Sequence, residues 1–279
     1  MADSASEGFE INGITSHPSL ALQASIRLLR VRTLGIQDPA SAIQHPPSAI
    51  RHLASSIQQP MPTATVEDYL KRIYLLQQSD QTSLVLMGRL ATAMSVAPGT
   101  ATAMIKTLAE SELVDYEPRG GVRLTPSGER LALRVLRRHR LVELLLVEVL
   151  GLDWSQVHEE AEQLEHAISD TVVEKIDEVL GRPRVDPHGD PIPSAKGRVS
   201  HVKLLNLAEC EAGQHGRIAR IVDQDARFLK FASRHGLTPG AAVTVDERDD
   251  LAEAITVHAE GCKLVTMGAS AALKIFLEG

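Results

Sequence analysis

The sequence predicts a mainly α-helical protein with a small β domain at its C-terminal end. Amphipathic helical segments fill residues 65–110 and lead into a short predicted hairpin. A second helix-forming stretch, rich in acidic residues, runs from His158 to about Leu180. Beyond residue 204 the pattern changes to short alternating strands. Because only 3% of the residues are aromatic, the cores must be built mainly from Leu, Val, Ile and Ala.

The chain has 279 residues, of which 43% are hydrophobic and 23% charged, and this indicates a globular protein of about two or three domains. No apolar run reaches the roughly 18–20 residues of a membrane-spanning helix. The first thirty residues lack a charged start followed by an apolar core, so secretion is unsupported. Cys210 and Cys262 stand outside any CxxC pattern, which fits a reducing compartment. We therefore expect a cytoplasmic protein without a membrane partner.

Residues 1–60 contain scattered Ser, Pro, Gln and His without a sustained amphipathic pattern. We expect this segment to be a disordered extension or the product of a misassigned start, and to be dispensable. From Thr65 to Leu76 apolar residues recur at helical spacing, and this pattern predicts a helix. Thr65 itself is a suitable helix cap.

Two further helices are expected at 84–94 and 98–110, separated by a short break. Pro98 suits a helix start, and small outward residues leave room to enter a DNA major groove about 12 Å wide. A hairpin around Arg119-Gly120-Gly121 follows. Two helices separated by a break occur in any helical hairpin. The basic β-hairpin that follows them favours a winged helix-turn-helix domain that binds double-stranded DNA. The candidate DNA contacts are Pro98, Gly99, Thr100, Thr102, Ala103, Lys106, Arg119 and Arg123.

The charge of the chain is unevenly divided. Residues 84–140 hold nine Lys and Arg against five Asp and Glu, whereas residues 141–180 hold one Lys against eleven acids. This division predicts a phosphate-binding part joined to a cation-binding part.

The acidic part contains a candidate metal stripe. His158, Glu162, Glu165 and His166 follow one another at helical spacing and would share one face of a helix. Carboxylates and imidazoles suit a divalent first-row metal, because they offer lone pairs without thiolate chemistry. A solvated acidic helix face is the alternative explanation.

Several motifs together give the chain a resemblance to a known family. From Thr65 to Ser194, the chain resembles the metal-dependent repressors of the diphtheria toxin repressor and manganese transport regulator family. The motifs are Glu67-Asp68-Tyr69-Leu70, Leu124-Thr125-Pro126-Ser127-Gly128, Arg138-His139-Arg140-Leu141-Val142-Glu143, Gly151-Leu152-Asp153, Glu162-Gln163-Leu164-Glu165-His166 and the run from Asp186 to Pro193.

The resemblance implies about two metal ions per subunit of a homodimer. The first ligand set is Asp68, Glu162, Glu165 and His166, and the second is His139, Glu143 and His158. The spacing of His139 and Glu143, four residues apart, supports the second set independently, because it places them on one helix face.

The resemblance also bears on the metal. Iron-type members carry Met and Cys where this chain has Asp68 and Glu162, and oxygen ligands favour Mn²⁺, with Fe²⁺ able to substitute. Manganese-type members carry an acidic residue at the position of Lys71, so their closely spaced metal pair is not assured here.

The end of the chain is expected to form a small closed β-barrel, similar to the Src-homology-3-like barrel of longer family members. Its strands are expected at 216–222, 241–245, 254–257 and 262–266, with a helix at 226–235. Family barrels can lend ligands to the second metal; the matching positions here are Arg220 and Asp223. Arg220 cannot bind a cation, so Asp223, with Gln224 as an additional option, is the candidate.

The predicted function is a metal-dependent, DNA-binding transcriptional regulator, mainly a repressor, of metal-uptake and homeostasis genes. The apolar run Leu141–Leu150 is expected to be buried by the second subunit, although an ordinary domain core is the alternative. A metal-dependent hydrolase is the rival function, but no HExxH motif, nucleophile elbow or glycine-rich phosphate loop supports an enzyme.

The predicted domain boundaries follow from these motifs. They are 1–60 for the extension, 61–133 for the DNA-binding domain, 134–180 for the metal-binding and dimerisation domain, 181–203 for a linker and 204–279 for the barrel.

Overall fold

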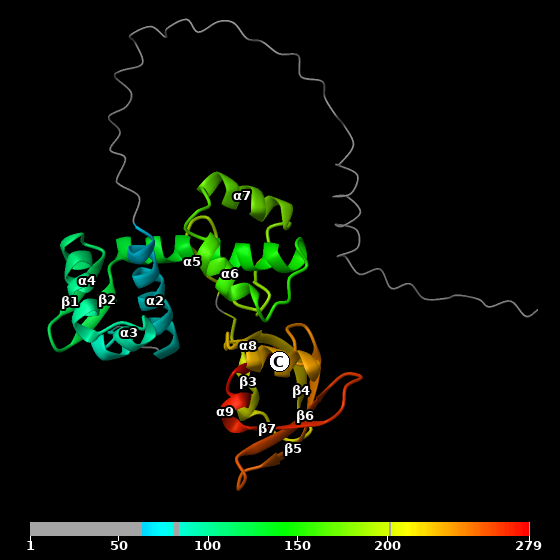
Figure 1. Cartoon of the computed structure of the whole chain (residues 1–279). Helices are drawn as coiled ribbons and strands as arrows, with labels where there is room; N and C mark the ends of the chain where they lie inside the picture. Colours follow the sequence, from blue (N-terminus) through cyan, green and yellow to red (C-terminus); the bar gives the residue numbers. More distant parts are fainter. Residues whose placement is uncertain (1–62, 81–83, 201, 279) are drawn as a thin grey trace, which may run out of the picture. The chain divides into compact units, whose positions relative to one another are not determined.

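The computed structural model describes residues 63–80, 84–200 and 202–278. The extension expected over residues 1–60 lies outside this part of the chain. Figure 1 follows the described chain from helices in its N-terminal half to strands in its C-terminal part. No described helix is long and apolar enough to cross a membrane.

The N-terminal region is a winged helix-turn-helix. It consists of α2 (Ala64–Asp80), α3 (Met87–Ala93), α4 (Pro98–Glu110) and an antiparallel hairpin of β1 (Val114–Glu117) and β2 (Gly121–Leu124). Helical spacing of apolar residues buries one face of each helix, and the fully buried side chains include Leu70, Ile73, Leu90, Ile105 and Leu108. The predicted break between α3 and α4 and the predicted wing are confirmed.

The second helix starts later than predicted. Val85 lies in an extended segment and exchanges two backbone hydrogen bonds with Val122 of β2, at 2.8 and 2.9 Å. The Val85 side chain is 1% exposed. The prediction of a helix from residue 84 was wrong because pairing with the wing satisfies this backbone and buries the β-branched side chain.

Helix α5 (Pro126–Glu148) joins the winged domain to the middle of the chain. Thr125 caps it by accepting a hydrogen bond from the Gly128 amide at 3.1 Å. A Cβ at Gly128 would lie 2.0 Å from the Leu113 carbonyl oxygen, so only glycine allows this close approach. The early turns pack in the core of the winged domain, through Ala132 and Leu136. The last turns pack against α6 (Val157–Leu164) and α7 (Asp170–Val179).

The acidic run beyond residue 158 is two helices rather than one. Helix α6 ends at Leu164, and Ser169 caps α7 by accepting from the Val172 amide. Glu165 and His166 therefore lie in the turn after α6 and not on a shared helical stripe. The missed signal was Ser169 followed by Asp170, a common N-terminal pair for a helix.

The segment predicted as a linker packs against α5. Val185 pairs with Pro191 across a tight loop, and the Arg137 guanidinium donates to the Pro193 carbonyl at 3.0 Å. Asp186 is 4% exposed and His188 is 0% exposed. The prolines and glycines of this segment thus shape an ordered loop.

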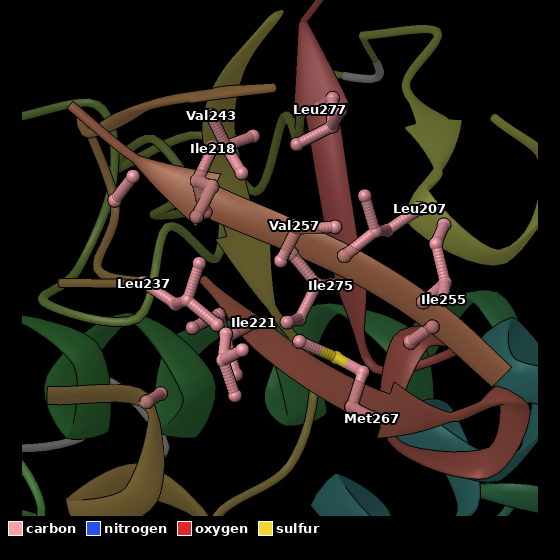
Figure 2. Packing of buried hydrophobic residues seen from close by; sticks show 14 of the residues in the cluster. Leu207, Ile218, Ile221, Leu237, Val243, Ile255, Val257, Met267, Ile275 and Leu277 are labelled. Carbon is pink, nitrogen blue, oxygen red and sulfur yellow. The ribbon is translucent and has the colours of Figure 1, made fainter. Parts of the chain in front are cut away.

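The C-terminal region is an antiparallel sheet around an aliphatic core. Its strands are β3 (Leu205–Asn206), β4 (His215–Ile221), β5 (Ala242–Asp249), β6 (Ala254–Ala259), β7 (Val265–Gly268) and β8 (Ile275–Glu278). The strand order is β3-β8-β4-β5-β6-β7, and three short helices, η2 (Leu207–Glu209), α8 (Ala226–Arg234) and α9 (Ala269–Ala272), complete the region. Figure 2 shows side chains such as Ile218, Val257 and Ile275 meeting inside it, because alternate strand residues face inward. The prediction missed β3 and β8.

Candidate metal centre

The first group of candidate ligands joins two distant parts of the chain. Asp68 lies on α2, whereas Glu165 and His166 follow α6. His166 Nε2 lies 2.8 Å from Asp68 Oδ1 and 3.3 Å from Glu165 Oε1. Two carboxylates and one imidazole nitrogen converge here, which is a donor set for a divalent first-row metal.

Glu67 orients the imidazole of this group. His166 Nδ1 donates to Glu67 Oε2 at 2.7 Å, and Glu67 Oε1 accepts from the Arg138 guanidinium at 3.1 Å. Burial lowers the pKa of His166, but the carboxylates of Glu67, Glu165 and Asp68 outweigh it and raise that pKa. The buried hydrogen bond from Nδ1 leaves Nε2 for a metal. Sequence reasoning quoted Glu67 in a motif but gave it no role.

The second group lies between α5 and α6. His139 Nε2 is 3.1 Å from both Glu143 Oε1 and His158 Nδ1, and His158 Nδ1 is 3.2 Å from Glu143 Oε1. Donor atoms about 2.1 Å from one ion lie roughly 3.0–3.4 Å apart at octahedral or tetrahedral angles. The three predicted ligands therefore already have the mutual spacing that a metal requires.

The carboxylates of the second group favour a positive charge on His139. Burial lowers the pKa of His139, but hydrogen bonds with Glu143 and Glu165 outweigh it and raise that pKa to about 9. Burial raises the pKa of Glu143, but hydrogen bonds with His139 and His158 reverse the effect and lower it. His139 Nδ1 donates to Glu165 Oε2 at 2.7 Å, which directs Nε2 towards Glu143 and His158.

Glu162 is not part of the cluster formed by Asp68, Glu165 and His166, the group to which it was assigned. Its Oε1 accepts a hydrogen bond from the Lys71 ammonium at 2.9 Å, and Glu165 Oε1 also accepts from Lys71. Glu162 and Glu165 form a further cluster with His139, and Lys71, 3% exposed, is bonded to both of its carboxylates. Burial raises the pKa of Glu162, but the Lys71 ammonium outweighs it and lowers that pKa. The lysine thus serves as a fixed cation between the two carboxylates.

A fourth group comprises Glu143, Asp186 and His188. All three side chains are buried, and Glu143 Oε2 and His188 Nδ1 have no hydrogen-bond partner among the described residues. Burial raises the pKa of Asp186, and the nearby carboxylates of Asp190 and Glu143 raise it further. Asp186 and His188 belong to a motif that carries the family resemblance, but neither was predicted as a metal ligand.

Asp223 belongs to none of the four clusters found among the described residues. Its Oδ2 accepts from the Lys274 ammonium, and its Oδ1 accepts from the Asp225 amide at 2.9 Å. Its carboxylate is therefore engaged within the C-terminal region.

The predicted recognition helix α4 presents a mixed surface. Ala101, Ile105 and Leu108 face the core, and Met104 and Ala109 pack partly against it. Most of the candidate DNA contacts are exposed, namely Pro98, Gly99, Thr100, Ala103, Lys106, Arg119 and Arg123. Thr102 is half-buried, and its hydroxyl donates to the Pro98 carbonyl at 2.8 Å. Arg123 is paired with Asp115 at 3.0 Å on the wing.

Most of the basic residues that produce the local surplus lie away from the predicted DNA-binding surface. Three of the nine are the buried residues Arg137, Arg138 and Arg140 on α5, and each is paired with acidic side chains. Arg134 is paired with Asp170. Within residues 84–130 there are five basic and five acidic residues. The charge count therefore overestimated the number of basic residues on the predicted DNA-binding surface. DNA binding is inferred from the winged fold instead.

The domain comparisons identify the first two regions. Residues 61–122 match the N-terminal DNA-binding domain of iron-dependent repressors, and residues 125–194 match their metal-binding and dimerisation domain. The chain belongs to the iron-dependent repressor family. Residues 205–279 match a FeoA domain, which agrees with the Src-homology-3-like sheet.

Curated relatives in this repressor family match between about half and two thirds of the chain. The iron-dependent repressor IdeR of Mycobacterium leprae is 30% identical over 194 residues, which is 65% of this chain and 84% of the relative. The diphtheria toxin repressor of Corynebacterium glutamicum is 36% identical over 129 residues, or 46% of this chain and 56% of the relative.

Solved repressor structures agree. A manganese-dependent transcriptional repressor in complex with manganese has 40% identity and a TM-score of 0.70, covering 76% of this chain and 98% of the other. ScaR with bound Cd²⁺ has 31% identity and a TM-score of 0.66, with the same coverage. The predicted metal-dependent repressor is confirmed, and the comparisons do not support the hydrolase alternative.

Proposed function

We propose that this repressor is activated by Mn²⁺, with Fe²⁺ able to substitute, and that it regulates genes for metal uptake from a DNA operator in the cytoplasm. The observation that carries the proposal is the convergence of Asp68 on α2 with Glu165 and His166 after α6. Because α2 packs in the winged domain, a metal held by these residues constrains that domain.

The first metal position comprises Asp68, Glu165 and His166, with Glu162 beside them. A divalent ion held by these residues would supply positive charge in place of the proton shared between His166 and the carboxylates. Glu67 and Arg138 then fix the imidazole from its other nitrogen. Oxygen donors dominate this set, which suits Mn²⁺ among the ions available in the cell.

The second position comprises His139, Glu143 and His158. Their mutual distances of 3.1–3.2 Å fit one ion without rearrangement. Asp223 can contribute only if its ion pair with Lys274 opens, so we leave it outside the proposed ligand set.

Lys71 is proposed to keep a third ion away from the cluster of His139, Glu162 and Glu165. Its ammonium donates to both carboxylates, so an ion there would have to displace a buried, paired charge. Two ions per subunit at the positions above are consistent with this arrangement.

Helix α4 and the wing are proposed to contact DNA. Thr100 and Ala103 face outward at the start of α4 and would read base edges, whereas Lys106, Arg119 and Arg123 would contact phosphates. The half-buried Thr102 is proposed to support the start of α4, because its hydroxyl is bonded to the Pro98 carbonyl.

The dimer is proposed to form through an apolar groove on the middle region. The groove is lined by residues of α5 and α7, namely Leu145, Thr171, Val172, Lys175, Ile176 and Val179. Val172 is 44% exposed and Val179 is 49% exposed, and both line this groove, so a second subunit that fills it would bury them. Leu141, Val142 and Leu146 are already buried within the chain, so only part of the run 141–150 is available to a second subunit.

A fluorescence anisotropy titration of DNA tests the proposed activation. DNA that contains the operator, selected from random fragments, is titrated with the full chain in the presence of Mn²⁺ or of a chelator. Mn²⁺ is expected to tighten binding by about 5–150-fold, the usual range of coupling between two sites. Equal affinity in both conditions contradicts the proposal.

A further inference from the structure

Arg138 joins three helices of the described chain. It lies on α5, and its two terminal nitrogens contact carboxylates on two other helices. Nη1 donates to Glu67 Oε1 on α2 and Nη2 donates to Asp170 Oδ1 on α7, each at 3.1 Å. The planar guanidinium carries its donors in a fixed fork, so one side chain holds both carboxylates at a defined separation.

The contact on α2 lies beside the first metal position. Glu67 precedes the proposed ligand Asp68 in the sequence, and its second oxygen, Oε2, accepts from His166 Nδ1 at 2.7 Å. Arg138 is 3% exposed and Glu67 is 5% exposed. Because a buried charge that loses its partner is strongly destabilising, Glu67 is held between Arg138 and His166. A movement of His166 or of α2 would therefore act on the Arg138 guanidinium.

The contact on α7 lies at the start of that helix. Asp170 is its first residue and directly follows the cap Ser169. A carboxylate in the first turn is stabilised by the helix dipole, and its bond to Arg138 ties this turn to α5. Further along α7, Val172, Ile176 and Val179 line the groove proposed for the second subunit. The position of the first turn therefore affects the shape of that groove.

Arg134 offers a comparison within the same helix. It also lies on α5 and pairs with the other oxygen of Asp170, but its side chain is 49% exposed. Among the ion pairs of the described residues, Arg134 has no carboxylate on α2. Two arginines thus hold Asp170, and Arg138 is the one that extends the contact to Glu67.

We propose that Arg138 is a positioning residue that couples the first metal position to α7, and through α7 to the groove for the second subunit. The proposal rests on the proposed function, because it uses that metal position and that groove. When Asp68 and His166 hold an ion, Glu67 is fixed beside them, and its bond with Arg138 restrains the first turn of α7. Because coupling between two sites is reciprocal, a second subunit in the groove would in turn tighten metal binding.

Hydrogen exchange of the full chain, measured by mass spectrometry with saturating Mn²⁺ or with a chelator, tests the coupling. In the unchanged protein, Mn²⁺ is expected to slow exchange in α2 and in the first turns of α7 by at least about fivefold, the lower end of the usual coupling between two sites. Arg138→Lys keeps the charge but loses the fork, so the slowing should persist in α2 and disappear in α7. Arg134→Lys is the matched control and should keep both responses.

The difference between the two conditions separates coupling from a purely structural role. An arginine with a structural role alone would change the exchange of α7 equally with Mn²⁺ and with chelator, so Arg138→Lys would keep the Mn²⁺-dependent difference of the unchanged protein. That result overturns the proposal. Loss of the difference in α7 alone supports it.

A second pair of variants keeps the test available if Arg138→Lys disturbs folding. Asp170→Ala removes the α7 end of the link and leaves Glu67 paired with Arg138. Glu174→Ala removes another acid of α7, which pairs with Arg137, and is the control. Asp170→Ala should lose the α7 response and Glu174→Ala should keep it. Equal responses in these two variants overturn the proposal.

The unchanged protein distinguishes this proposal from the function on which it rests. Slowing in α2 without slowing in α7 leaves the first metal position intact and overturns the coupling. If Mn²⁺ slows exchange neither in α2 nor in the turn after α6, the first metal position itself fails, and the coupling fails with it.

Discussion

The first and second metal positions have similar donor chemistry but join very different parts of the molecule. Asp68 and His166 are 98 residues apart in sequence, and Asp68 belongs to the winged domain. His139 and His158 are 19 residues apart, on adjacent helices of the middle region. In the proposed function, the same type of ligand would thus couple metal to DNA binding in one place and hold two neighbouring helices together in the other.

The largest expected effect is on DNA binding when the first position is broken. Asp68→Ala removes the only proposed ligand from the winged domain, so Mn²⁺ should lose most of its 5–150-fold effect on DNA affinity. His158→Ala should lose a smaller part, because both of its helices lie in the middle region. Anisotropy titrations with and without Mn²⁺ measure both. Glu160→Ala, an exposed acid on α6, is the control. An equal loss in the Asp68 and His158 variants would remove the distinction between the two positions.

The pH dependence of the free energy of unfolding should report on His139 of the second position. The folded-state pKa of His139 is about 9, above the unfolded value of 6.5. Its stabilising contribution is therefore fully present below pH 6.5 and is lost as the pH rises towards 9, on the order of 3 kcal/mol in the metal-free protein. Urea unfolding in chelator from pH 6 to 9.5 measures this loss, and His139→Gln should flatten the curve. The same slope in His139→Gln would assign the effect to another group.

Metal choice should be determined by the first position. The double variant Asp68→Met, Glu162→Cys replaces two oxygen donors with sulfur, and softer donors favour Fe²⁺ or Co²⁺ relative to Mn²⁺. DNA-binding titrations with each ion should therefore move away from Mn²⁺. Glu162 accepts from Lys71 and lies beside the Asp68 group, so single variants are needed to apportion the shift. An unchanged Mn²⁺ response in the double variant means that these side chains are not primary ligands.

Variants of Lys71 test whether its ammonium group keeps a metal ion out of the space between the two positions. Lys71→Glu replaces the ammonium with a carboxylate beside His139, Glu162 and Glu165, and one additional Mn²⁺ per chain is expected. Lys71→Met removes the charge without adding a ligand and is the matched control. Equilibrium dialysis gives the counts, and an unchanged count in Lys71→Glu contradicts the proposed role of the lysine.

The smallest expected effects are at the DNA surface. Lys106→Ala should weaken binding to all sequences and reduce the slope of log affinity against log salt by about 1, the value for one phosphate contact. Arg123→Ala should do the same only in part, because Arg123 is paired with Asp115. Thr100→Ala should instead change base preference. Equal losses on operator and random DNA for Thr100→Ala would exclude a base contact.

Local patterns were sufficient for much of the fold. The apolar spacing in α2 and α4, the break between α3 and α4, and the glycines of the wing each determine structure within a few residues. His139 and Glu143 were found for the same reason, since four residues on one helix fix their proximity. The start of α3 was wrong because the partner of Val85 lies 37 residues away, in β2.

What the sequence by itself determined is therefore most of the helical segments, without the division between α6 and α7, together with the wing, the family resemblance and the types of metal ligand. Only the tertiary structure decided which groups meet. It placed Glu67 behind His166, Lys71 between Glu162 and Glu165, and the α5 arginines against buried acids instead of DNA. It also turned a proline-rich segment into a loop that aims His188 at Glu143. The physical reason is that the energy of a buried charge depends on its partners in space, and residue type and local spacing do not specify partners that lie far away in the sequence.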